Sequence, residues 1–253
     1  MAANTAKYVI HPIPLCTNEN FPRASLHWLL PVPSDQKIRV CHYAWYIEGP
    51  GHNYLVDAGV TAERIIARNF KSLPVQTVDE GLRKIGLEVD DIDYVILTHS
   101  HYDHSAELYR FSKAKVIIQQ AELDQIKHPF AYTKPRLPKD FESLFDGADW
   151  EIVRGDTKID DNIELILTPG HTAGGQSVAV KTAAGTAVIT GWCCTQENFD
   201  PPPAFAEKGF PFTIGASHAN PMELYDSTRR IIELADLILP CHEYESLINR
   251  TAI

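Results

Sequence analysis

The sequence has no excess of basic residues and no long hydrophobic run. These two absences argue against a nucleic-acid-binding protein and against a membrane protein. Its 253 residues include 23 Lys and Arg against 33 Asp and Glu, which gives a formal net charge of −10. Nucleic-acid partners require a basic face, so we expect none here. No window is apolar and long enough for a membrane span or a signal sequence, so we expect no membrane association and a cytoplasmic location.

Cysteine is also scarce, and its number is odd. The five residues are Cys16, Cys41, Cys193, Cys194 and Cys241. An odd count with one adjacent pair does not suit a disulfide framework, which is consistent with a reducing compartment. The 44% hydrophobic and 22% charged composition is that of an ordinary globular protein with a sizeable core.

Short apolar runs alternate with helical patterns along the chain. Residues 94–97 read as a buried strand, residues 49–51 as the turn of a hairpin, and residues 221–234 as a helix. Thr77 and Glu80 have the spacing of a helix-start capping box. Early hairpins followed by strands that helices separate predict an α+β or layered αββα arrangement. Two proline-containing stretches, residues 128–139 and 199–215, are expected to be long surface loops that could cover a site.

The strongest chemical signal is the segment HSHYDH at residues 99–104, directly after the predicted strand. It places four potential metal ligands within six residues, and imidazole and carboxylate groups bind zinc and similar divalent ions. In an extended chain His99 and His101 point to the same side. Asp103 and His104 follow where the chain turns, so they can reach a second ion nearby.

This segment resembles the HxHxDH signature of the metallo-β-lactamase superfamily. YLVDAG at residues 54–59 and TPGHTAGG at residues 168–175 are similar to two further motifs of that family, and His242 after the strand LILP completes the order. The resemblance extends over nearly the whole chain. It implies a single domain over residues 1–253, folded as a four-layer αββα sandwich.

The resemblance also implies a ligand set and an activity. The ligands of one metal ion would be His99, His101 and His171, and those of the other would be Asp103, His104 and His242. Two divalent ions, most simply zinc, although iron and manganese suit the same ligands, would activate water as a metal-bound hydroxide. The hydroxide would open a lactone or a related small ester, and Asp103 would act as the catalytic proton carrier. Asp57 is expected to orient a ligand histidine or to anchor its own turn.

The family pattern fails at one ligand. Members usually carry a bridging aspartate after a later strand, where this sequence reads ITGWCCT at residues 189–195 and has Gly191 or Trp192 at that position. Three explanations are open. A thiolate of Cys193 or Cys194 replaces the carboxylate, one metal site is vacant or exchangeable, or the bridge is only water-derived.

Within the superfamily, the chain is most similar to N-acyl homoserine lactonases. TQENF at residues 195–199 and the pair His242 and Glu243 resemble that group. Cys194, however, occupies the position of a tyrosine that those enzymes place near the metals, so the sequence leaves the substrate open. We expect a small-molecule substrate, with Cys194, Trp192 and His218 as its binding residues.

Other functions compete with hydrolysis. An enzyme-derived binding protein would take up small carbonyl compounds without consuming them. An iron-containing redox member of the superfamily would need a flavin partner, because no dinucleotide fingerprint is visible here. The apolar residues Trp28, Leu29 and Leu30 suit either a homodimer contact or a core strand.

Overall fold

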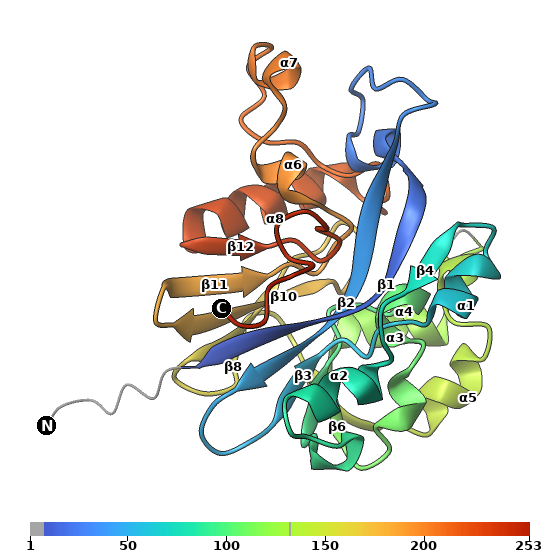
Figure 1. Cartoon of the computed structure of the whole chain (residues 1–253), viewed down its shortest axis with the longest axis vertical. Helices are drawn as coiled ribbons and strands as arrows, with labels where there is room; N and C mark the ends of the chain where they lie inside the picture. The colour runs from blue at the N-terminus through green and yellow to red at the C-terminus, as the bar shows by residue number, and fades with distance from the viewer. Residues whose placement is uncertain (1–7, 132) are drawn as a thin grey trace, which may run out of the picture.

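Two β-sheets face each other between two layers of helices in this computed structural model, which describes residues 8–131 and 133–253 (Figure 1). The first sheet has seven strands in the order β4-β1-β2-β3-β5-β6-β7, and the second has five in the order β12-β11-β10-β9-β8. Helices α2, α4 and α5 lie beyond the first sheet, and α8 lies beyond the second. The α+β, four-layer arrangement predicted from the sequence is confirmed.

The elements have the following bounds. The strands of the first sheet are β1 (Val9–Pro22), β2 (Lys37–Glu48), β3 (Tyr54–Val56), β4 (Ser72–Pro74), β5 (Tyr94–Ile96), β6 (Lys115–Gln119) and β7 (Asp149–Val153). Those of the second are β8 (Thr157–Lys158), β9 (Ile163–Leu167), β10 (Gln176–Thr182), β11 (Gly185–Ile189) and β12 (Leu237–Leu239). The α-helices are α1 (Ala62–Ile66), α2 (Val78–Lys84), α3 (Tyr102–Ser105), α4 (Gln120–Lys127), α5 (Phe141–Asp146), α6 (Gln196–Phe199), α7 (Pro203–Ala206) and α8 (Pro221–Leu234).

Alternation along the strands of the first sheet builds two of the hydrophobic layers. On β5, Val95 packs into the cluster under α2, α4 and α5, whereas Ile96 packs into the cluster between the two sheets. Val116 and Ile117 on β6 divide in the same way. Successive side chains of a strand point to opposite faces, so a continuous apolar run is required where both faces are covered.

The second sheet is covered on its outer face by α8. On β10, Val178 faces the other sheet and Ala179 faces the cluster that holds Leu224 and Ile231 of α8. Asn220 caps α8 by accepting from the amides of residues 222 and 223, and Pro221 occupies its first position. This helix therefore begins and ends where the sequence predicted.

Strand β1 was not predicted from the sequence, because Pro12 and Pro14 fall inside it. The structure pairs β1 with β2 along its length but with β4 only at Cys16, Thr17 and Asn18. The two prolines therefore lie where one edge of β1 has no paired strand, which is where a strand tolerates residues without an N–H.

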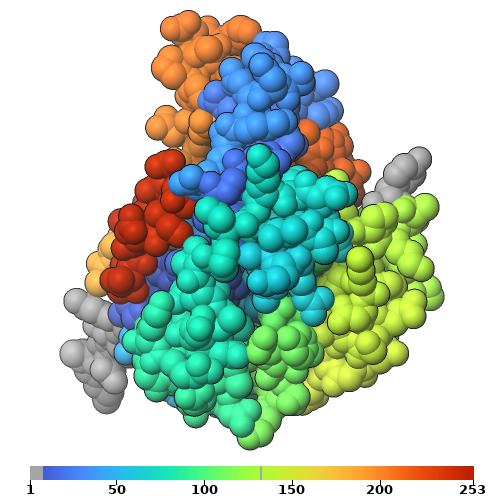
Figure 2. Space-filling model, turned by 45° about the vertical axis from the view of Figure 1, so that its right-hand side comes forward, coloured from blue at the N-terminus to red at the C-terminus, as the bar shows by residue number. Residues whose placement is uncertain are grey.

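The connection after β1 and the segment around α7 project from the same end of the molecule (Figures 1 and 2). A backbone hydrogen bond connects the two segments, because the amide of Trp28 donates to the carbonyl of Ile214 at 2.8 Å. Leu29 is 80% exposed beside them, so it is not part of a core strand; the homodimer contact stays a prediction. Among the described residues, no helix is long and apolar enough to cross a membrane.

Candidate metal centre

The candidate site lies at the carboxyl ends of the parallel strands β3, β5 and β6. Strand β5 ends at Ile96, and the chain then runs through His99 and His101 before α3 begins at Tyr102. His99 is fully buried and His101 is 5% exposed. The strand anchors this segment in both hydrophobic layers, so the backbone of the histidines is fixed by packing.

His99, His101 and His171 form the first group of donors. Nε2 of His99 lies 3.1 Å from Nδ1 of His101, and the His171 ring centroid is 4.7 Å from both other rings. His171 follows β9 through a turn at Gly170, whose φ is +120°. A Cβ atom at that position would lie 2.2 Å from the backbone nitrogen of Leu224, so only glycine fits. The three residues form a potential tridentate metal site.

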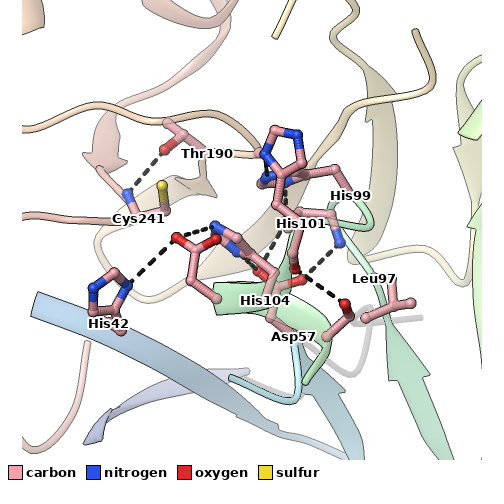
Figure 3. Close-up of polar contacts among 12 residues, drawn as sticks. His42, Asp57, Leu97, His99, His101, His104, Thr190 and Cys241 are labelled. Carbon is pink, nitrogen blue, oxygen red and sulfur yellow. Dashed lines mark hydrogen bonds and ion pairs between the residues drawn. The ribbon is translucent and has the colours of Figure 1, made fainter. Parts of the chain in front are cut away.

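Asp103, His104 and His242 converge in a second group beside the first. Asp103 Oδ2 lies 3.6 Å from Nε2 of His104 and 3.4 Å from Nε2 of His242. His242 comes from the segment after β12, and its Nδ1 contacts the carbonyl of Cys41 at 3.2 Å. The structure therefore brings all six predicted ligands together. A seventh side chain, His42 of β2, approaches the same carboxylate, with its Nδ1 at 3.5 Å from Asp103 Oδ2 (Figure 3).

Asp57 holds His104 in place. Its Oδ2 lies 2.7 Å from His104 Nδ1 and accepts from the Thr98 hydroxyl at 2.9 Å, while its Oδ1 accepts from the Thr98 amide at 2.8 Å. Such a carboxylate selects the tautomer that carries the proton on Nδ1 and leaves Nε2 free for a metal. The backbone of Asp57 has φ +59°, a conformation that aspartate and asparagine tolerate better than most residues.

The protonation states of the groups suit metal binding. Burial lowers the pKa of His99 and His101 well below the usual value, that of His171 to about 4, and that of His242 to about 3. Burial alone would raise the pKa of Asp103, but the neighbouring His104, His42 and His242 hold it well below its usual value. Neutral imidazoles beside an ionised carboxylate are the forms that bind a divalent cation.

His104 differs from the other histidines of the site. Burial disfavours its charged form, yet the carboxylates of Asp57 and Asp103 raise its pKa to about 9. A metal ion that binds at Nε2 must therefore displace a proton from this ring. The two aspartates thus stabilise a positive charge at this position.

Glu122 links the two loops that carry the first group, and the sequence did not reveal it. Its side chain is fully buried at the start of α4. Oε1 accepts from the amide of Ser100 at 2.8 Å, and Oε2 accepts from the amide of Gly174 at 3.1 Å. Ser100 lies between His99 and His101, and Gly174 follows His171, so one carboxylate sets the spacing of the three histidines.

We expect Glu122→Gln to weaken binding at the first group by about 10-fold, since outer partners of metal ligands have effects of this size. The amide nitrogen would face a backbone N–H, and a buried donor left unpaired costs about 2 kcal/mol of unfolding free energy. Metal titration and thermal unfolding measure both effects. Glu233→Gln, at an exposed position of α8, is the matched control. Equal metal affinity in the two variants would contradict the role of Glu122.

A model of the metallo-beta-lactamase superfamily matches residues 41–191. The chain belongs to this superfamily. An N-acyl homoserine lactonase of Bacillus sp is 30% identical to it over 180 residues, which cover 66% of this chain and 68% of that protein. N-acyl homoserine lactonase AiiA of Bacillus thuringiensis subsp. kurstaki is 29% identical over the same shares.

Solved structures of two enzymes described as a lactone hydrolase and a lactonase share the fold. An N-acyl homoserine lactone hydrolase with the product N-hexanoyl-L-homoserine at its catalytic metal center matches with a TM-score of 0.73 and 22% identity over 95% of both chains. AidC, a dizinc quorum-quenching lactonase, matches with a TM-score of 0.67 and 16% identity over 95% of this chain and 88% of that one. The predicted resemblance to the superfamily and to its lactonases is confirmed.

The two positions at which the superfamily pattern would place its bridging aspartate offer no carboxylate here. At Gly191 a Cβ atom would lie 1.9 Å from the carbonyl oxygen of Gln176, so the backbone leaves no space for a side chain. The Trp192 ring is buried in the cluster beneath α8, against Phe199. The structure thus agrees with the sequence that this ligand is missing.

A cavity of about 290 Å³ opens above the ligands. Its lining includes His101, Asp103, His171 and His242, the apolar side chains of Phe21, Val40 and Phe70, and the guanidinium of Arg136. Arg136 comes from the predicted loop at residues 128–139, so that loop does contribute to the site. The residue itself was not predicted, because no local pattern marks it.

The three predicted substrate-binding residues lie outside the described lining of this cavity. Trp192 and Cys194 are buried in the cluster beneath α8, and the Cys194 thiol lies 3.1 Å from the Thr190 hydroxyl. His218 binds the carbonyl of Gly215 through Nδ1 at 2.9 Å, and its ring packs edge-on against Trp28. The cysteine that does line the cavity is Cys193.

Proposed function

We propose that this protein is a metal-dependent hydrolase that opens a lactone or a related small ester. The observation that carries the proposal is the convergence of six histidine and aspartate donors, four of which line one cavity. The lactonases to which the chain is similar act on N-acyl homoserine lactones. The cavity of about 290 Å³ suits a small substrate.

The donor set fits two divalent cations. Every imidazole of the set is buried. Four of them direct Nδ1 at a protein oxygen, which leaves Nε2 for an ion: His99, His104, His171 and His242. His99, His101 and His171 would hold one ion, and Asp103, His104 and His242 would hold the other. We take zinc as the ion, because histidine nitrogen and aspartate oxygen are among its usual ligands. Elemental analysis would distinguish zinc from iron and manganese. When bound, the ions would polarise the carbonyl and lower the pKa of water.

Among the residues that the structure describes as lining the cavity, the acidic one is Asp103. Its side chain is 14% exposed. The neighbouring histidines hold its pKa well below its usual value, so the carboxylate is ionised. Its place in the cavity lining lets it accept the proton that the attacking water gives up. The water oxygen forms a bond to the carbonyl carbon, and the bond between that carbon and the ring oxygen then breaks. The proton passes from Asp103 to that oxygen, which leaves as an alcohol.

Arg136 is placed to bind the polar end of the substrate or the carboxylate of the product. It lines the cavity from a short 3-10 turn and hydrogen-bonds to the hydroxyl of Ser217. We expect Arg136→Ala to raise KM by about 10-fold and to leave kcat within about 3-fold, because one charge-assisted hydrogen bond to the ligand is lost. Lys134→Ala, in the same turn but directed at the Phe141 ring, is the control. An unchanged KM for Arg136→Ala would contradict the assignment.

The direct test of the proposed function combines elemental analysis with turnover of a lactone and aryl-ester panel before and after chelation. We expect about two ions per chain, turnover that a chelator abolishes, and recovery when zinc is restored. Uptake of lactones without turnover at full metal loading would discard the hydrolase and leave a binding protein. Bound iron with oxygen or peroxide turnover would instead establish the redox alternative.

A further inference from the structure

His42 is buried without a hydrogen-bond partner, although it sits beside the metal ligands. Its side chain is 4% exposed, and neither Nδ1 nor Nε2 makes a hydrogen bond among the described residues. A buried polar group without a partner destabilises a fold, so native proteins keep few of them. The two nitrogens therefore indicate a partner of another kind.

Three imidazole nitrogens surround one oxygen of Asp103 at nearly equal distances. Oδ2 lies 3.5 Å from Nδ1 of His42, 3.6 Å from Nε2 of His104 and 3.4 Å from Nε2 of His242. An ion with bonds of about 2.1 Å to four ligands at tetrahedral angles keeps those ligands about 3.4 Å apart. The three distances from Asp103 Oδ2 match this spacing, and the donor atoms of His42, Asp103 and His242 all lie within 4.8 Å of one another.

The local backbone directs His42 into this position. On β2, His42 shares a face with Ala44 and Tyr46, which pack into the cluster under α2, α4 and α5. The register of β1 against β2 shifts between Pro14 and Cys16, and Cys16 is the partner of His42. The extra residue of this bulge, Leu15, lies on β1, so β2 keeps its alternation and His42 stays on the face of Ala44 and Tyr46.

Cys241 is the competing donor, because its sulfur lies close to His104 and His242. Its thiol, however, donates to the carbonyl of Trp192 at 2.7 Å, and its amide donates to Thr190 at 3.1 Å (Figure 3). The thiol is therefore already satisfied, whereas the His42 nitrogens are not. Of the two, the observations favour His42.

We propose that His42 is the fourth protein ligand of the second metal ion and compensates for the missing bridging aspartate. The inference rests on the proposed binding of two ions. It goes beyond the ligand set of the superfamily pattern, because an imidazole from β2 binds one ion only, whereas a bridging carboxylate binds both. Because positions 191 and 192 supply no carboxylate that would link the two ions, the ions can bind one after the other.

The test measures metal binding on the full chain without reference to activity. Metal-free wild type, His42→Phe, His42→Gln and Cys241→Ser are titrated with Zn²⁺ and Co²⁺ against a chromophoric chelator, and the bound ions are counted. We expect both His42 variants to keep the affinity of the first ion and to bind the second about 100-fold more weakly, since even outer partners of ligands cost 10- to 100-fold. Cys241→Ser should bind both ions as wild type does, and the cobalt spectrum should lack a sulfur charge-transfer band.

Unfolding of the metal-free proteins provides the folding control. His42→Phe keeps an aromatic ring and removes the unpaired nitrogens, so its metal-free unfolding temperature should not fall below that of wild type. Wild-type affinity for the second ion in both His42 variants would overturn the inference, as would a sulfur band that Cys241→Ser abolishes. Loss of the second ion in the His42 variants, with no ester turnover by wild type, would keep the inference and discard the hydrolase.

Discussion

Asp103→Asn is expected to lower kcat/KM for a lactone by about 1,000-fold, because it removes both a ligand charge and the proposed proton carrier. The carboxylate contacts His42, His104 and His242, and an asparagine would fill the same space without the negative charge. The second ion should also bind more weakly. Steady-state kinetics and ion counting on the same sample measure the two effects.

Excess metal separates these two roles of Asp103. Raising the zinc concentration should refill the second site of Asp103→Asn, whereas proton transfer should stay impaired. Asp90→Asn, which changes an exposed aspartate paired with Lys113, is the matched control and should behave as wild type. If the fully loaded Asp103→Asn variant turns over within 10-fold of wild type, Asp103 is a ligand only and another group carries the proton.

Asp57→Asn is expected to weaken the second ion by about 10- to 100-fold, the effect typical of a lost carboxylate behind a ligand histidine. The side-chain amide would place a donor against His104 Nδ1, which now lies 2.7 Å from the carboxylate. The His104 proton would then move to Nε2, the nitrogen that the metal requires. Because asparagine tolerates the positive φ of this position, the backbone should be unaffected.

The control for this change is Asp93→Asn. Asp93 also accepts a backbone N–H, from Asn53 at 2.8 Å, but it is exposed and lies away from the donors. NMR of the imidazole protons would report the tautomer of His104 directly. A wild-type affinity for both ions in Asp57→Asn would show that the ligand histidine keeps its orientation without the carboxylate.

Local signals made part of this structure predictable from the sequence. The HSHYDH segment follows a strand whose anchoring depends only on alternation, and the Asn220 cap with Pro221 defines the start of α8. The capping box of Thr77 and Glu80 is present as predicted. Each of these signals lies within a few residues of the feature it specifies.

The remaining features depend on contacts between distant parts of the chain. His42 lies 61 positions before Asp103 in the sequence and looks like an ordinary strand residue. The two residues meet only because β3 pairs with both β2 and β5. Trp192 was expected to face the substrate, but the turn after β11 directs its ring beneath α8. No short pattern encodes the pairing order of strands, so sequence reasoning could not reach these contacts.

The reactivity of the five cysteines toward a thiol reagent can report local opening of the fold. All five are buried, and Cys193 alone among them contributes to the described lining of the cavity. A thiol reagent should therefore modify Cys193 during local openings of the site, and the other four cysteines only when the packing that buries them opens. Protection of Cys193 by an added compound would report occupancy of the cavity, with no need to know whether that compound is consumed.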